Sequence, residues 1–454
     1  MRVLAQFKTF RQERGFWPFF IWAALILGII LRVIFVNDME YKEDEEYNFT
    51  QTQLIGVTQP WPWYGIPSGV YLVNPGMSIW VFAVLAKLFA IHQPTSLAHA
   101  LQLFAILGMS LVIPFAVKCV PKEDRKTWFW AFALAMVNPF LILYQRKLWP
   151  EPFLPFFTML VLAGWWTRST RKGATLWGFI GAWLGQIHMS GFFFSAALFL
   201  WTLFFERGIN RKFDRNLGKS RTNWLWWFIG SVLGALPLIP WFIYIIQHPL
   251  KESMTSGFYE IAQLKYWTFW FTDPLGLHLG NPVGLLRGES NWAQISDFVR
   301  YPLVSGHATY LVGLAHFVAL AAAVGIFLKG GLQLRNYFKR RKPQWVPLLT
   351  GAGSSTAFLQ NSAFLGCGLL LTLTGVVIRR YYMTVTFPLE FIFLIRMASP
   401  KSRSGQQLLL ALWIAQLIMS AGFVNYIHVN NGSTYGDYGE AYHVHHLPHG
   451  VASE

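Results

Sequence analysis

Long apolar segments recur along this chain and limit what it can fold into. Each holds roughly 17 residues or more, or slightly fewer where its ends are aromatic, which is about the length of helix that crosses a bilayer. Lipid offers no hydrogen-bond partner to peptide groups, so the backbone of these segments must be helical. The segments are residues 17–36, 97–117, 127–145, 152–167, 174–188, 190–206, 224–246, 309–328, 356–378, 383–396 and 407–424. The sequence therefore predicts an all-α, polytopic transmembrane protein with about 11–12 spans.

The composition agrees with a surface that faces lipid. Charged residues make up only 13% of the 454 residues, against about 25% in soluble domains. The 22 Trp and 40 Phe fit aromatic belts at the two bilayer interfaces. The net charge of +16 does not point to nucleic acid, because the basic residues form short clusters between apolar segments rather than one basic face. Membrane lipid is thus an expected partner, and nucleic acid is not.

Basic clusters set the expected orientation, since Lys and Arg are enriched in cytoplasmic loops. The clusters expected inside are the N-terminal segment with Arg2, Lys8, Arg11 and Arg14, followed by 118–126, 168–172, 207–221, 329–342 and 401–403. The first loop, 37–75, and the long loop, 247–308, are then outside. We expect residues 1–424 to form one transmembrane catalytic module and residues 425–454 to form a tail on its outer face.

Residues 76–91 do not fit this alternation. The segment is apolar enough to be a span, but a full crossing there would place the basic loop at 118–126 outside. Either the helix at 76–91 is re-entrant or interfacial, which we favour, or the segment crosses and the charge bias fails locally.

The loop after the first span is unusually acidic. It holds six of the 21 acidic residues of the chain, namely Asp38, Glu40, Glu43, Asp44, Glu45 and Glu46. One interpretation is a solvated loop that helps to orient the protein. The other is a carboxylate at the mouth of a membrane cavity that acts as a general base or metal ligand, because clustered carboxylates raise the pKa of one another.

Two turns between spans carry adjacent cations on the expected outer side, against the usual charge bias. They hold Arg146 with Lys147, and Arg379 with Arg380. These side chains either reach toward lipid phosphates or form a cationic site for the phosphate of a lipid-linked substrate, which Arg binds with two parallel hydrogen bonds.

Three further polar features of the sequence are candidates for a functional role. His188 lies at an expected outer turn, where a lone His is more often a hydrogen-bonded structural group than a catalyst. Glu390 lies within an apolar span, so it is either functional or paired with Arg396 or a neighbouring helix. The tail contains spaced histidines (His443, His445, His446 and His449) but no acidic or Cys ligand at metal-site spacing, so we expect it to dock on the outer face.

Several short motifs resemble the GT-C superfamily of membrane glycosyltransferases. Within that superfamily, the motifs are most similar to the bacterial branch related to protein O-mannosyltransferases and aminoarabinose transferases. The resemblance covers about the first 400 residues in layout. The motifs are Asp44-Glu45-Glu46-Tyr47 after the first span, Asn138-Pro-Phe leading to Gln145-Arg146-Lys147, Gln186-Ile-His188, and Arg380-Tyr-Tyr leading to Thr386-Phe-Pro388.

The resemblance implies transfer of a sugar from a polyprenyl-phosphate donor to an extracytoplasmic glycan, lipid or protein acceptor. It implies an active site that faces the periplasm or exterior from a bacterial inner membrane. Some members of the superfamily use a divalent cation near the loop carboxylates and others do not, so the resemblance leaves metal dependence undecided.

By the same resemblance, Asp44, with Glu45 beside it, takes the catalytic role and removes the proton of the acceptor hydroxyl. The leaving phosphate needs its charge stabilised more than it needs a proton. Arg146, Lys147, Arg379 and Arg380 are the residues expected to supply this stabilisation, and Arg380 is the first choice. Residues expected to contact substrate are Tyr47, Glu151 and His188.

The competing hypothesis is a polytopic transporter or lipid flippase. Transporters of this kind contain matching Gly/Pro-broken helices in two halves, with coupling sites near the midplane of the membrane. This sequence has no such pair, and its acidic cluster lies at an interface. We therefore favour the enzyme.

Overall fold

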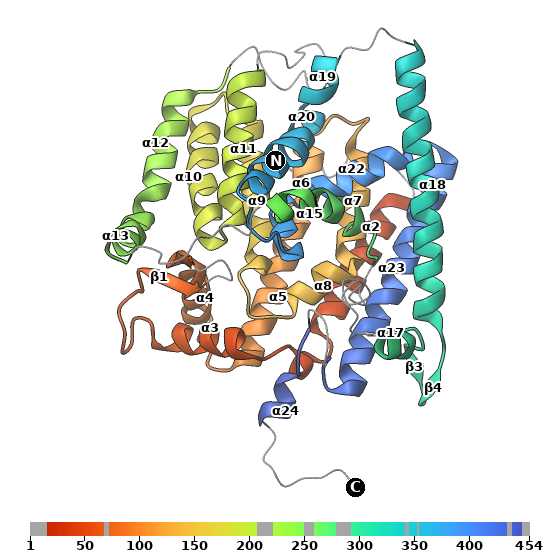
Figure 1. The fold of residues 1–454 in the computed structure, drawn as a ribbon, viewed down its shortest axis with the longest axis horizontal. Helices are drawn as coiled ribbons and strands as arrows, with labels where there is room; N and C mark the ends of the chain where they lie inside the picture. Colours follow the sequence, from red (N-terminus) through yellow and green to blue (C-terminus); the bar gives the residue numbers. More distant parts are fainter. Residues whose placement is uncertain are drawn as a thin grey trace.

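The computed structural model describes residues 16–67, 72–206, 221–248, 258–277, 292–340, 345–351, 354–433 and 438–446. Within these ranges nearly all regular structure is helical, as expected (Figure 1). The named strands there form two short antiparallel pairs, β1 (Tyr64–Pro67) with β2 (Val73–Pro75) and β3 (Leu303–Val304) with β4 (His307–Ala308). The all-α prediction is confirmed.

Five helical stretches in the described ranges are long and apolar enough to cross a membrane. They are α5 (Pro94–Ser110) with α6 (Val112–Lys118); α12 (Trp224–Ala235), η4 (Leu236–Leu238) and α13 (Ile239–Gln247); α18 (Leu311–Arg340); α20 (Ser355–Asn361), η5 (Ser362–Cys367) and α21 (Gly368–Leu373); and α23 (Arg403–Asn430). Large apolar side chains such as Phe228 and Phe317 are 60% and 70% exposed on α12 and α18, as lipid-facing residues are. The chain is a multi-pass integral membrane protein.

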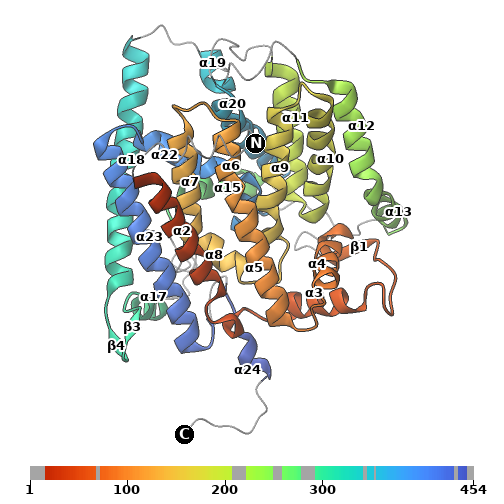
Figure 2. The same cartoon turned by 180° about the vertical axis from the view of Figure 1, so that it is seen from behind.

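Other expected spans form shorter helices. They are α2 (Phe16–Val33), α9 (Leu154–Trp166), α10 (Arg171–Ile187) and α11 (Ser190–Phe205). In the bundle α2 packs against α7 and α5, whereas α10 lies between α9, α11 and α12 (Figures 1 and 2). The number of full crossings, about 11–12 by sequence, stays a prediction.

The expected span 127–145 is bent. It consists of α7 (Arg125–Val137) and α8 (Pro139–Gln145), which meet at 57°. Pro139 cannot continue the hydrogen-bond ladder of α7, and the Asn138 side chain caps α8 by accepting from the backbone N–H groups of Phe140 and Leu141, both at 3.1 Å. The bend turns the end of α8 sideways within the bundle.

The expected span 383–396 is helical in two unlike pieces. Residues Arg380–Thr386 form the 3₁₀ helix η6, and α22 (Leu389–Ala398) follows Pro388. At about 1.5 Å per residue, the 10 residues of α22 are too short to cross a bilayer. Glu390 does not pair with Arg396, because Glu390 accepts from the Thr386 hydroxyl while Arg396 donates to Gln360.

Part of the expected outer loop 247–308 enters the bundle. Residues 249–257 and 278–291 lie outside the described residues. Between them, α14 (Phe258–Ala262) leads into α15 (Lys265–Thr272), whose Tyr266 and Trp270 are buried. The Tyr266 hydroxyl donates to the Ala363 carbonyl at 2.7 Å, within the π-helical turn η5, where backbone carbonyl groups are freed from the regular α-helical pattern. The short α17 (Trp292–Phe298) lies beside α23 near β3.

Two helices lie across one end of the bundle, α3 (Glu43–Leu54) and α4 (Met77–Leu88) (Figures 1 and 2). With 12 residues, α4 is about 18 Å long, well short of a bilayer core. This agrees with the interfacial or re-entrant helix expected at 76–91. The small elements η1 (Val36–Asp38), η2 (Glu151–Phe153) and α24 (Tyr442–His446) complete this end, and α19 (Trp345–Thr350) lies at the opposite end.

Candidate functional site

A cavity of about 260 Å³ opens where α3 meets three turns of the bundle. Asp44 and Asn48 line it from α3, Glu151 from η2, and His188 from the turn between α10 and α11. Tyr381 and Tyr382 of η6 and the indole ring of Trp149 complete its polar and aromatic wall, while Met189, Phe193, Leu371 and Val376 form an apolar wall. The volume is close to the lower end of small-molecule sites, which begins at roughly 300 Å³.

Asp44 lies in the first turn of α3, where four consecutive acidic residues face the positive end of the helix dipole. This explains why the acidic run begins a helix instead of staying an open loop. Partial burial, and then the charge of Glu40, raise the pKa of the Asp44 carboxyl. An aspartate at the mouth of a cavity with a raised pKa is suited to accept a proton.

Glu45 points away from the cavity, although it is the neighbour of Asp44. It is buried, and its carboxylate accepts from the backbone N–H of Lys42 at 3.1 Å, which is one half of a capping box at the start of α3. Burial and then the charge of Glu40 raise the pKa of Glu45 to about 8. Tyr47, also expected at the site, packs with Ile55 and Ile79 in the contact between α3 and α4.

Lys147 is buried beneath the acidic loop, where it forms an ion pair with Glu40. Its Nζ lies 4.2 Å from the centre of the Trp149 ring, and that ring lines the cavity. Lys147 also lowers the pKa of Asp44 and Glu45, opposing the effect of Glu40. After burial, Glu40 and Lys147 are thus the two largest and opposing influences on the pKa of the candidate base.

Glu151 and His188 meet at the wall of the cavity, with 3.5 Å between the carboxylate Oε1 and the imidazole Nε2. Burial raises the pKa of Glu151 to about 8 and lowers the pKa of His188 to about 4. His188 Nδ1 lies 2.7 Å from the Ser190 hydroxyl, and its ring contacts Tyr382 edge to face. Within the described ranges, the Glu151 Oε2 atom is buried without a hydrogen-bond partner.

The two arginines of the second cationic turn, Arg379 and Arg380, have different surroundings. Arg380 forms an ion pair with Asp273 at 3.2 Å, and its guanidinium lies over the ring of Phe140 at 4.3 Å. Arg379 is exposed between the lining residues Val376 and Tyr381. Burial raises the pKa of both tyrosines of η6, and the charge of Arg379 opposes that rise. No hydrogen bond or ion pair holds the Arg379 side chain in the part of the chain that the structure describes.

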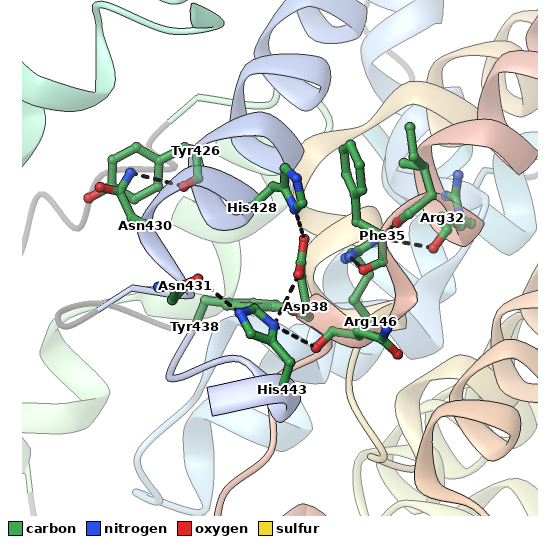
Figure 3. A network of polar contacts seen from close by, with 12 residues as sticks. Arg32, Phe35, Asp38, Arg146, Tyr426, His428, Asn430, Asn431, Tyr438 and His443 are labelled. Atoms are coloured by element: carbon green, nitrogen blue, oxygen red, sulfur yellow. Dashed lines mark hydrogen bonds and ion pairs between the residues drawn. The ribbon is translucent and has the colours of Figure 1, made fainter. Parts of the chain in front are cut away.

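Arg146 is 1% exposed and lies on the far side of the turn from the cavity lining. Its guanidinium donates to the carbonyl groups of Arg32, Ile34 and Phe35 at 2.7–3.0 Å (Figure 3). Carbonyl groups at the end of a helix have no partner within the helix, so Arg146 supplies the missing donors at the end of α2. Arg146 therefore stabilises the end of α2 through these hydrogen bonds.

Sequence reasoning missed some of the residues around the cavity. Asn48 follows Asp44 by four residues, so helical spacing already places it on the same face of α3; its side-chain amide donates to the Leu148 carbonyl at 2.7 Å. Nothing in the sequence marked Asp273 as a residue near the site, because it lies inside a long segment expected to be a loop. Among the described residues, no three His, Cys, Asp or Glu side chains converge as they would around a metal ion.

The comparisons with known proteins give structural likenesses only. No protein-family model matches the sequence, and no curated protein matches it. The oligosaccharyltransferase of Archaeoglobus fulgidus in the apo form aligns with a TM-score of 0.46 and 13% identity, over 92% of this chain and 56% of that one. The same enzyme tethered to an acceptor peptide with the NVT sequon gives 0.46 and 12%, over 90% and 54%. ArnT from Cupriavidus metallidurans in the apo state gives 0.42 and 12%, over 90% of this chain and 76% of that one. This chain thus spans a little over half the length of the oligosaccharyltransferase.

Proposed function

We propose that this protein is a glycosyltransferase that moves a sugar from a polyprenyl-phosphate donor to an acceptor on the extracytoplasmic face of the membrane. The observation that carries the proposal is the cavity at one end of the bundle, where the Asp44 carboxyl faces an aromatic wall and the Glu151–His188 pair. A small, largely apolar cavity with aromatic rings and a few polar groups suits a sugar, whose hydroxyl groups need hydrogen-bond partners and whose C–H faces pack on rings.

Asp44 is the proposed base. Its carboxylate takes the proton of the acceptor hydroxyl while the acceptor oxygen forms a bond to the anomeric carbon. The bond from that carbon to the phosphate oxygen breaks, and its electron pair leaves with polyprenyl phosphate. The raised pKa of Asp44 favours this role, because a base works best when its pKa approaches the operating pH.

Arg379 is the proposed partner of the leaving phosphate. Of the four cations expected to bind phosphate, Arg146 donates to backbone carbonyl groups, while Lys147 and Arg380 form ion pairs with Glu40 and Asp273. Arg379 lies beside the cavity with an exposed guanidinium. A positioned cation stabilises the charge that develops as the phosphate departs.

The proposed direction of the site follows from the charge pattern. Four basic segments, of which the described residues are 118–126, 168–172, 329–340 and 401–403, lie at or next to the ends of α6, α10, α18 and α23 that are remote from the cavity end of the bundle (Figure 1). Since basic segments stay on the cytoplasmic side, the cavity faces the other side.

Incubation of the purified protein with a panel of polyprenyl-phosphate sugars tests the function. We expect release of free polyprenyl phosphate from at least one donor, faster than in the same mixture without protein. Movement of intact donor across vesicle membranes, with no release of polyprenyl phosphate from any donor, would instead support the flippase.

A further inference from the structure

The C-terminal segment of the chain is built onto the acidic loop. We call the described residues 438–446 the C-terminal strap. The backbone N–H of Tyr41 donates to the Glu440 carbonyl at 3.2 Å, and the N–H of Tyr442 donates to the Met39 carbonyl at 2.9 Å. Glu40 and Ala441 form an antiparallel bridge between these bonds, and Ala441 is fully buried. The strap thus pairs with residues 39–41 as an added strand would. The described part of the tail thus docks on the acidic loop, and the position of that loop on the outer face stays a prediction.

Side chains reinforce this pairing around Asp38. Tyr438, the first residue of the strap, is buried, and its hydroxyl donates to the Asp38 carbonyl at 2.5 Å. The Asp38 carboxylate lies 2.8 Å from His428 Nδ1 of α23 and 3.3 Å from His443 Nδ1 of the strap (Figure 3). The other nitrogen of His443 lies 2.8 Å from the Asn431 side-chain oxygen. Asp38, only 3% exposed, therefore links η1, α23 and the strap.

The strap and the candidate base are connected through one residue. Glu40 is held by its backbone bridge to Ala441, and its side chain forms the ion pair with buried Lys147. The Tyr438 ring lies on the other side of Lys147, with its centre 5.8 Å from Nζ. Asp44 follows Glu40 by four residues and feels the charges of both members of the pair.

We propose that the C-terminal strap is a positioning element of the active site, which holds the Glu40–Lys147 pair beside Asp44 through the contacts of Tyr438 and Asp38. The proposal rests on the proposed function for its catalytic meaning, but the contact it describes is testable without turnover. Tyr438 and Asp38 act through Glu40 and Lys147 and do not line the cavity.

Release of the strap has a predictable electrostatic sign. When the bridge to Ala441 opens, Glu40 loses its backbone tether and can turn toward water with half-exposed Lys42, its second ion-pair partner at 2.8 Å, so its repulsion of the Asp44 carboxylate weakens. Lys147 stays buried near Asp44 and favours the ionised carboxylate. The weaker repulsion by Glu40 lowers the pKa of Asp44, and the charge of Lys147, which Glu40 then offsets less, lowers it further. The charged and titratable groups around Asp44 are Glu40, Lys42, Glu43, Lys147, Glu151 and Tyr381.

Two substitutions in the full chain loosen the strap without touching the cavity. Tyr438→Phe removes the donor to the Asp38 carbonyl and the hydroxyl that hydrogen-bonds with Arg146, and keeps the buried ring. Asp38→Asn removes the charge between the two histidines. Tyr310→Phe is the matched control, because the same hydroxyl is lost from a side chain that is 59% exposed outside the strap. Loss of one hydrogen bond should make the open state roughly two- to tenfold more frequent, and the double variant Asp38→Asn/Tyr438→Phe more so.

Two measurements read the strap and the acid separately. A spin label on Val444→Cys, an exposed strap position, reports the mobility of the strap once Cys119 is replaced by Ser. Carbodiimide reacts with protonated carboxyl groups, so the pH midpoint of its reaction at Asp44, followed by peptide mass spectrometry, reports the titration of that residue. In the double variant we expect a larger mobile fraction of the label and a lower midpoint at Asp44, with no change in Tyr310→Phe.

The acid limb of kcat/KM against pH should move to lower pH together with the midpoint. An immobile label in the double variant, or a mobile label with an unchanged Asp44 midpoint, would overturn the positioning role. A shifted midpoint in a protein that releases no polyprenyl phosphate from any donor would remove the proposed function and leave the strap inference standing.

Discussion

Two buried arginines show how this protein satisfies charge without carboxylates. Arg32, fully buried, donates to the carbonyl groups of Met136 and Ala135 at 2.6 and 3.3 Å and to the Gln145 side chain. The break at Pro139 leaves carbonyl groups near the end of α7 without helical partners, and the guanidinium of Arg32 donates hydrogen bonds to them. Arg146 does the same for the end of α2. Reasoning from charge alone looks for an acidic or phosphate partner, so the structural use of Arg146 could not be predicted without knowing where the two helix ends meet.

Arg379 carries the phosphate prediction at this scale. Arg379→Gln should lower kcat/KM by about 30- to 1000-fold, because about 2–4 kcal/mol of stabilisation of the leaving phosphate is lost. Arg379→Lys should restore only part of the rate, since an ammonium cannot form the two-pronged contact. Arg300→Gln, a change at another exposed arginine, is the control. Wild-type kcat/KM in Arg379→Gln would leave the donor phosphate without its proposed partner.

Glu151 gives a prediction on stability. Its pKa rises from an ordinary 4.5 to about 8 on folding, because burial favours the neutral acid. A raised pKa means that its stability contribution is present below about pH 4.5 and is lost as pH rises through about 8. As pH rises from 5 to 9, wild type should therefore lose more stability than Glu151→Gln, by on the order of 4 kcal/mol. Thermal unfolding across this range measures it, with Glu46→Gln as an exposed control, and parallel curves for wild type and Glu151→Gln would contradict the burial argument.

At the scale of elements, apolar length predicted where most helices lie but not how they break. The Asn138-Pro139 pair was visible in the sequence, yet a continuous apolar segment reads as one span until the bend is seen. The η6 helix and the interior position of α15 were missed for a related reason. Tyr266 and Trp270 are buried only because α21, η6 and α22 surround them, which is information held by the fold and not by the local sequence.

The Asp273–Arg380 ion pair links these two elements and yields a prediction. Asp273 also accepts from the Asn138 side chain through its backbone carbonyl at 2.8 Å, so the pair connects α15, η6 and the start of α8. If Arg380 acts by holding η6, Asp273→Asn and Arg380→Gln should destabilise the protein similarly, by roughly 1–3 kcal/mol. Both should also raise KM, because Tyr381 and Tyr382 shift within the cavity wall. Thermal unfolding and steady-state kinetics of the two variants measure this. A large loss of kcat/KM in Arg380→Gln with none in Asp273→Asn would contradict the structural role and support binding of the donor phosphate by Arg380.

At the scale of the whole molecule, the acidic loop predicted from sequence lies at the end of the bundle where the cavity opens. The expected site residues that meet at the cavity are Asp44, Glu151 and His188, with Arg379 beside it. Glu45, Tyr47, Arg146, Lys147 and Arg380 lie around that site and hold its parts in place. Sequence spacing indicates which segments gather at one end, but the direction of each side chain depends on packing between distant helices.

The orientation of the molecule makes a prediction that labelling tests. Val57, 74% exposed in the turn after α3, should lie outside, and Lys401, between α22 and α23, should lie inside. In a Cys119→Ser background, a membrane-impermeant thiol reagent should label Val57→Cys in intact cells and Lys401→Cys only after permeabilisation. The reverse pattern would place the cavity on the cytoplasmic side.

The most direct test of the central claim compares release of polyprenyl phosphate by wild type, Asp44→Asn and Glu46→Gln with an accepted donor and acceptor. We predict that Asp44→Asn lowers turnover by about a hundredfold or more while donor binding, measured as thermal stabilisation by the donor, stays near wild type. Glu46→Gln, an exposed neighbour on α3, should retain most of the activity. Undiminished release by Asp44→Asn would contradict the assignment of the base and, with it, the reaction proposed for this cavity.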